Sequence, residues 1–118
     1  MKYLMMSCCL VLCSLLNAQV NVNNININNL KSVNYIEVSC DLRLVAARVN
    51  VYVDYGQNTI LESSRSIIKD EEGKEIKFLS HMQVLNYFDN NGWDLVEKET
   101  VVINSNKIRK NFLLKKEE

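Results

Sequence analysis

The chain has 118 residues, of which 47% are hydrophobic and 24% are charged. This composition is typical of one globular domain and excludes a collagen-like chain or a multidomain enzyme. Lys and Arg together number 14, as do Asp and Glu, so the formal net charge is zero. A neutral chain has no long-range field to attract nucleic acid or anionic lipid, and we expect neither as a partner.

The amino end carries an apolar run over residues 3–16, preceded by Lys2. The run is shorter than the roughly 20 apolar residues that span a bilayer, and polar sequence follows Ala18. We interpret 1–19 as a cleaved secretory signal peptide, which places the mature protein in the periplasm or outside the cell. The alternative is an uncleaved anchor, the one way in which we expect this chain to touch a membrane. Leu16, where a small residue is usual, favours that alternative.

Cysteine usage changes once the leader is removed. Cys8, Cys9 and Cys13 lie within it, which leaves Cys40 as the one thiol of the mature chain. No intramolecular disulfide can then form, so a core and sheet hydrogen bonds must hold the domain together.

Residues 20–34 are rich in asparagine, with Val and Ile between the asparagines. Asn favours turns and caps over the interiors of strands. We interpret the segment as a linker or a weak edge strand. The asparagines are at positions 21, 23, 24, 26, 28, 29 and 34.

The folded domain is expected over 35–118 and begins with strand composition at 35–40, which Asp41 interrupts. A hairpin then leads to 45–55, where strict alternation predicts a half-buried strand ending at Gly56. Its expected inward row is Val45, Ala47, Val49, Val51, Val53 and Tyr55. The opposite row is Arg48, Asn50, Tyr52 and Asp54.

A small hairpin is predicted over 65–78, with Gly73 at its turn. The acidic run Asp70, Glu71 and Glu72 precedes that glycine. It lacks the ligand spacing of a calcium loop, so we interpret it as a solvated turn.

A helix is predicted to start at Ser80, which with Gln83 matches the capping box. Asn91-Gly92 supplies a stop with Gly92 in the left-handed conformation, and Trp93 is expected to fold back onto the helix as a core residue. The expected staple is Leu79 with Val84, and the expected core face is Met82, Val84, Leu85 and Phe88.

Residues 93–103 read as a long strand whose apolar phase shifts, which predicts a bulge near Glu97. A turn at 104–106 leads to a final strand carrying Ile108, Phe112 and Leu114. The fold class predicted is therefore α+β: an antiparallel sheet of four to six strands with one helix on one face, in the order β-β-(β-hairpin)-α-β-β.

The helix followed by Asn-Gly-Trp-Asp-Leu-Val, together with Val53-Asp-Tyr-Gly-Gln and the terminal Leu-Leu-Lys-Lys, resembles small exported Bacteroides-type proteins of unknown function. These are short bacterial domains with a Gly-Trp-Glu-Leu-Val strand, and this chain has Asp94 in place of the Glu. The resemblance covers roughly 35–116. It implies an α+β fold and a location in the cell envelope, and it carries over no catalytic residues.

Few residues suit catalysis. His81 is the one histidine, and it pairs with Cys40 as nucleophile and base only if the fold brings them within hydrogen-bond reach. No ligand spacing predicts a metal site, and the glycines at 56, 73 and 92 stand alone, without a phosphate loop. We therefore expect no cofactor.

Two functions from different classes follow. The first is a non-enzymatic interaction module, because one helix covers only one face of the sheet and leaves Arg48, Asn50, Tyr52 and Asp54 for a protein partner or for self-association. An ordinary solvated sheet face explains the same residues equally well. The second function is a small envelope hydrolase that uses Cys40 with His81, or carboxylates.

Overall fold

The computed structural model describes residues 18–43, 48–57 and 65–118, and most of the expected leader, 1–17, lies outside them, as do Val45 and Ala47. The fold is mostly antiparallel sheet with one α-helix, so the α+β class is confirmed. The predicted single sheet is wrong because the strands form two sheets, and the predicted order is wrong because β1 and β2 precede it and β5 alone stands in place of the hairpin. The elements are β1 (Asn21–Val22), β2 (Ile25–Asn26), the 3-10 turn η1 (Ile27–Asn29), β3 (Tyr35–Arg43), β4 (Asn50–Asp54), β5 (Ile68–Lys69), α2 (His81–Asn90), β6 (Trp93–Asn104) and β7 (Lys107–Lys116).

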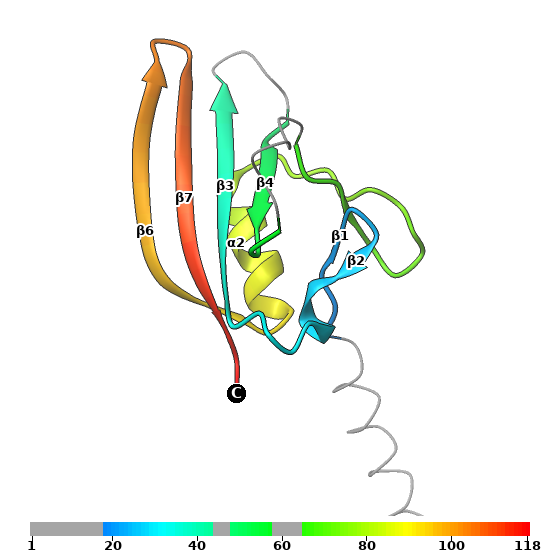
Figure 1. Cartoon of the computed structure of the whole chain (residues 1–118). Helices are drawn as coiled ribbons and strands as arrows, with labels where there is room; N and C mark the ends of the chain where they lie inside the picture. The colour runs from blue at the N-terminus through cyan, green and yellow to red at the C-terminus, as the bar shows by residue number, and fades with distance from the viewer. Residues whose placement is uncertain (1–17, 44–47, 58–64) are drawn as a thin grey trace, which may run out of the picture.

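The larger sheet has the strand order β4-β3-β7-β6, and all its neighbours are antiparallel. Helix α2 lies behind it, and β1 and β2 lie to one side (Figure 1). None of the helices in the described residues is both long and apolar enough to cross a membrane.

Strand β3 extends further than the sequence indicates. Asp41 was expected to interrupt it, but the strand continues to Arg43, and Asp41 pairs with Asn50 on one side and Arg109 on the other. The prediction was wrong because a charged residue is tolerated within a strand when another strand supplies opposite charge. The hairpin from β3 to β4 is confirmed.

Strand β4 confirms the alternation within its described part. Val49, Val51 and Val53 are buried, and Asn50 and Tyr52 are only partly exposed. The outer edge of β4 is closed by a segment that is not a strand: Ser66 N–H donates to Val51 O at 2.7 Å, and its hydroxyl accepts from Val53 N–H at 2.9 Å.

The bulge predicted near Glu97 is confirmed, because the β6–β7 register shifts between Leu95 and Glu97. A second shift lies between Val102 and Asn104. Strand β6 forms one edge of the larger sheet, and most of its residues are exposed.

Helix α2 starts as predicted. The Ser80 hydroxyl accepts from Gln83 N–H at 3.1 Å, and Gln83 Oε1 accepts from Leu79 N–H at 2.8 Å. Two expected core contacts are wrong: Met82 is 50% exposed and Leu79, the expected staple residue, is 66% exposed. The buried residues of the helix are Val84 and Phe88, at a spacing of four, and Leu85 is partly buried against the core.

The Asn-rich segment is part of the folded body. Asn23 and Asn24, with φ of 49° and 69°, form the two-residue turn between β1 and β2, a conformation that Asn tolerates better than most residues. Strand β1 pairs with both β2 and β5, so β2 is an edge and β1 is central. Val20, Val22 and Ile27 are completely buried. Asn23 and Asn24 therefore form a turn and Asn26 caps η1, whereas Asn21 lies within β1 of this ordered segment.

The hairpin predicted over 65–78 is also different from expectation. Its two arms meet only at the bridge between Lys69 and Glu75, around the turn containing Gly73. Strand β5, the first arm of the predicted hairpin, instead pairs with β1 of the Asn-rich segment.

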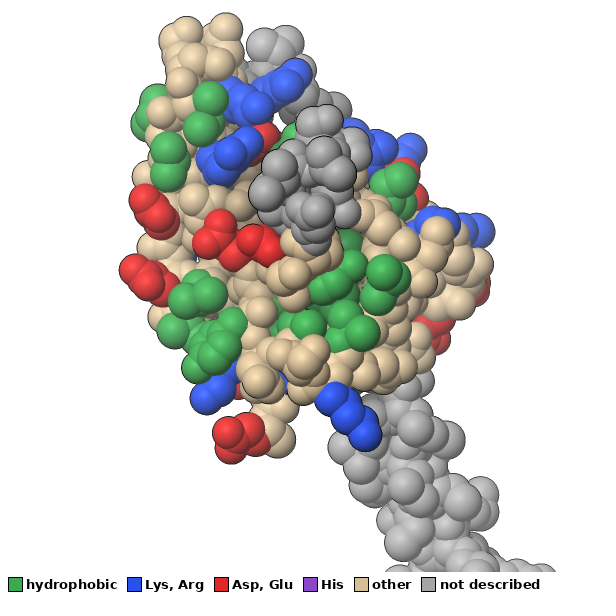
Figure 2. Space-filling view, viewed as in Figure 1, with side chains coloured by type: hydrophobic (Ala, Val, Ile, Leu, Met, Phe, Trp, Pro, Cys, Tyr) green, Lys and Arg blue, Asp and Glu red, His purple; other side chains and the backbone are tan. Residues whose placement is uncertain are grey.

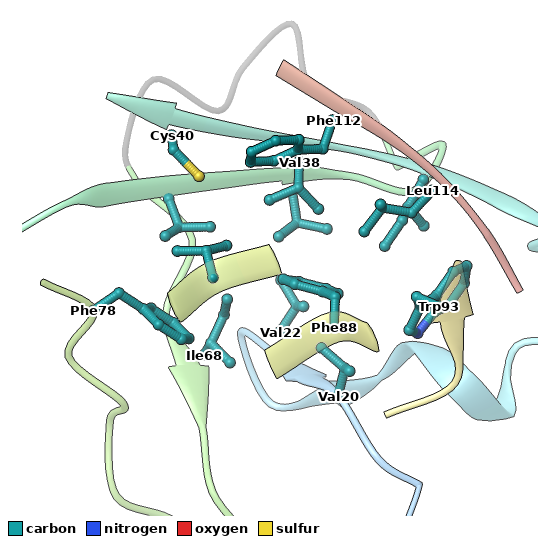
Figure 3. Close-up of a cluster of buried hydrophobic side chains, with 14 of the residues drawn as sticks. Val20, Val22, Val38, Cys40, Ile68, Phe78, Phe88, Trp93, Phe112 and Leu114 are labelled. Carbon is teal, nitrogen blue, oxygen red and sulfur yellow. The ribbon is translucent and has the colours of Figure 1, made fainter. Parts of the chain in front are cut away.

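The core lies between the larger sheet, α2 and β1. Val38, Phe112 and Leu114 extend from the sheet toward Phe88 of the helix and toward Val20 and Val22, with Trp93 at one end (Figure 3). Trp93 is completely buried and Gly92 has φ of +88°, so both features of the predicted helix stop are confirmed.

Candidate binding surface

The face of the larger sheet opposite α2 is called the open face here. Residues directly opposite each other on neighbouring strands share a face. Because Val38, Cys40 and Phe112 are buried beneath the helix, their strand neighbours Glu37, Ser39 and Asn111 lie on the open face. Ser39 and Asn111 are joined by a side-chain hydrogen bond of 2.7 Å.

One end of the open face carries a charge network around Asp41, whose side chain is 1% exposed. Arg109 Nε–H and Nη2–H donate to its two oxygens at 2.7 and 3.0 Å, and Lys107 Nζ lies 3.1 Å away. Burial acts to raise the pKa of Asp41, but the hydrogen bonds from Arg109 and Lys107 outweigh it and hold the pKa below the ordinary value. The Tyr52 ring lies 5.7 Å from the Arg109 guanidinium, which fixes the aromatic side chain beside this network.

The middle of the open face carries four carboxylates, which we call the acidic band: Glu37, Asp54, Glu97 and Glu99. Glu37 lies directly opposite Asp54, and Leu113 lies between Glu37 and Glu97 in the same row. Among the described residues, none of the four forms an ion pair with Lys or Arg. Acidic side chains gather over β6 and the middle of the sheet (Figure 2).

A hollow of about 120 Å³ lies within this band. Residues of β3, β6 and β7 line it, and the cationic Lys98 is among them, together with three of the four carboxylates. The residues lining it are Glu37, Glu97, Lys98, Glu99, Asn111 and Leu113.

Of the four residues expected at the site, three lie on the open face and one does not. Asn50, Tyr52 and Asp54 belong to the row that pairs with the open face of β3. Arg48 turns away, because its Nη2–H donates to Glu75 at 2.8 Å and Arg65 contacts the same carboxylate. Sequence reasoning missed Glu37, Glu97 and Glu99. The sequence shows that Glu97 and Glu99, two residues apart, lie on one face of a strand. It does not show the strand register that brings Glu37 beside them.

Cys40 and His81 are not joined by a hydrogen bond. Cys40 is completely buried, and burial, with a smaller effect of the Asp41 carboxylate, raises the pKa of its thiol to about 12. His81 stacks on Phe112 with ring centroids 6.4 Å apart. A buried thiol with this pKa does not supply a thiolate near neutral pH, so this geometry does not support Cys40 as a nucleophile.

A larger cavity of about 440 Å³ lies between the amino-terminal segment, the 69–72 turn and α2. Tyr87 lines it and donates to Gln19 O at 3.4 Å; burial, and then Asp70 and Glu71, raise the pKa of Tyr87 to about 12. Within the described ranges, no three His, Cys, Asp or Glu side chains are grouped to hold a metal ion. The residues that line the cavity include Lys69, Asp70, Glu71 and Glu72.

Comparisons with protein-family models, with curated protein sequences and with solved structures found no match to the chain.

Proposed function

We propose that the chain is an exported, non-enzymatic interaction module that binds a protein partner on the open face of its larger sheet. The observation that carries this proposal is the acidic band. Glu37 and Asp54 lie directly opposite each other, a like-charge arrangement that destabilises a sheet, and no Lys or Arg among the described residues offsets it by an ion pair. Asp54 also stabilises the turn after β4, because its Oδ1 accepts from Gly56 N–H at 3.0 Å. Like charges that no cation offsets are nevertheless expected where a partner uses them.

The neighbouring groups suit recognition. Tyr52 is held by Arg109, and Arg109 is held by the buried Asp41, so the aromatic side chain is already ordered before a partner arrives. Ordered aromatic and arginine side chains are common at the centres of protein interfaces, because little entropy is lost when they bind. An acidic band beside them selects a partner with a basic surface.

The test is capture from a cell-envelope extract, with quantitative mass spectrometry of what the immobilised mature protein retains. The open-face variant is Glu37→Gln with Tyr52→Ala. The control is Leu79→Ala with Met82→Ala, two exposed residues on the helix side. Circular dichroism and denaturation verify that each variant is folded.

A protein retained by the parent and the control, and lost from the open-face variant, supports the proposal once the purified pair binds directly with the same ranking. Equal retention by all three proteins, or loss only from the helix-side control, contradicts the open face as the binding surface. Turnover of an ester or peptide substrate that Cys40→Ser abolishes would instead revive the hydrolase alternative.

The apolar run over 3–16 supports export. Mass spectrometry of the mature protein is expected to find Gln19 or Val20 as the first residue, the products of cleavage after Ala18 or after Gln19. An intact Met1 in a membrane fraction would contradict export as a soluble protein.

A further inference from the structure

We infer that the partner is bound as an extended segment added to the β6 edge, with Lys or Arg at alternate positions. This inference rests on the proposed function and names its partner. It is carried by two independent observations: which edge of the larger sheet is free, and which charges line that edge.

The two edges of the larger sheet differ. Strand β4 is closed by Ser66, which bonds to Val51 and Val53, and by Phe78 O, which accepts from Val49 N–H at 2.9 Å. Strand β6 pairs only with β7 among the described strands. Between its two register shifts, Glu97–Val102 is a regular stretch whose outward N–H and C=O groups can bond to an added strand.

The charges on β6 determine which strand fits. Glu97 and Glu99 project to the open face, while Lys98, Thr100 and Val102 belong to the opposite face. A strand added beside β6 would place every second side chain next to Glu97 and Glu99. Lys or Arg at those positions neutralises the edge of the acidic band, and the hollow over Leu113 accommodates the aliphatic part of such a side chain.

A second copy of the chain fits this edge poorly. In a symmetric antiparallel pair that continues the sheet, pairing centred on Lys98 places two lysines opposite each other. Pairing centred on Glu99 places two carboxylates opposite each other. Centring on Thr100 sets each Glu99 against Val101. None of these registers brings a cation to the band, so charge favours a foreign basic strand.

The experiment uses the mature protein and short synthetic peptides, with amide chemical shifts and a binding isotherm as readouts. The first peptide has Lys at alternate positions, with Val or Thr between them. The second has the same sequence but is N-methylated along one edge, which keeps the charge and removes the backbone donors. The third has Glu in place of Lys. The protein variants are Glu97→Gln with Glu99→Gln, and the charge-matched control Glu72→Gln with Asp89→Asn.

We expect the first peptide to bind and to shift the amides of 97–102, and the other two to bind at least about tenfold more weakly. The Glu97→Gln, Glu99→Gln variant should lose about tenfold in affinity, the combined effect of two exposed ion pairs, and the control should not. Equal binding of the N-methylated peptide would overturn strand addition, as would self-association of the parent through β6. If no peptide binds while the open-face variant still loses its envelope partner, this inference fails and the proposed function stands.

Discussion

The indole Nε1–H of Trp93 donates a hydrogen bond of 3.1 Å to Oδ1 of Asn28, and this bond joins the end of α2 to the Asn-rich segment. Asn28 Oδ1 also accepts from Val20 N–H at 3.1 Å, and its Nδ2–H donates to Asn91 O at 2.8 Å. One amide side chain therefore satisfies three groups, one in the amino-terminal segment and two at the end of α2.

Replacing Asn28 with Ala should destabilise the fold by about 1–3 kcal/mol, because the buried Trp93 donor loses its acceptor. The control is Asn29→Ala, an exposed neighbour in the same turn, which should stay within about 0.5 kcal/mol of the parent. Urea denaturation of both variants gives the comparison. Equal stabilities would mean that Asn28 does not hold Trp93 in solution.

Gly92 should tolerate Asn better than Ala. Its φ is +88°, and an added Cβ would meet only Asn28 Nδ2 at 3.6 Å, an ordinary contact, so the penalty comes from the backbone and not from space. Gly92→Ala should cost about 1–2 kcal/mol, and Gly92→Asn less, because Asn visits the left-handed region more readily. If the two variants are equally stable, the left-handed backbone conformation of Gly92 is not the cause of the stability loss.

Trp93→Ala should cost roughly 3–5 kcal/mol, since it removes the largest completely buried side chain of the described core. Thermal and chemical denaturation should agree on the loss. A change near 0.5 kcal/mol, the size expected at a surface position, would remove Trp93 from the core.

Asp41 should contribute acid-sensitive stability. Its folded pKa lies below the ordinary value of a free carboxyl, so its contribution is fully present above about pH 4 and is lost as the pH falls through the folded pKa. Asp41→Asn should lower stability near neutral pH by about 1.5–3 kcal/mol, the range for hydrogen bonds to charged groups. It should also flatten the acid limb of a stability profile from pH 7 to pH 2. Asn29→Ala, an exposed change that removes no titratable group, is the control that should leave the limb unchanged.

Cys40 should resist alkylation in the folded mature protein. With a pKa raised to about 12 and no exposed surface, it reacts only when the structure opens. Labelling at pH 8 should therefore be slow, and urea should accelerate it to the rate of a free thiol. Ser32→Cys, at an exposed position, supplies the fast reference. Fast labelling of native Cys40 would make it a candidate nucleophile after all.

Local pattern was sufficient to predict the β4 alternation, the Ser80 cap, the Gly92 stop and the bulge before Glu97. Each depends on residues that are near one another in the chain. The pattern was not sufficient for Asp41 or Asn28, whose partners Arg109 and Trp93 lie 68 and 65 positions away. The same limit hid most of the acidic band, because Glu37, Glu97 and Asp54 meet only after all four strands of the larger sheet have adopted one register.

The closure of β4 by Ser66 also limits how the larger sheet can assemble. A sheet grows into a fibre only when each added subunit offers a fresh edge on its far side. Here one side of the larger sheet is already bonded within the molecule, so a strand joined at β6 ends the growth. Joining through this sheet therefore yields a complex of limited size, even at high protein concentration.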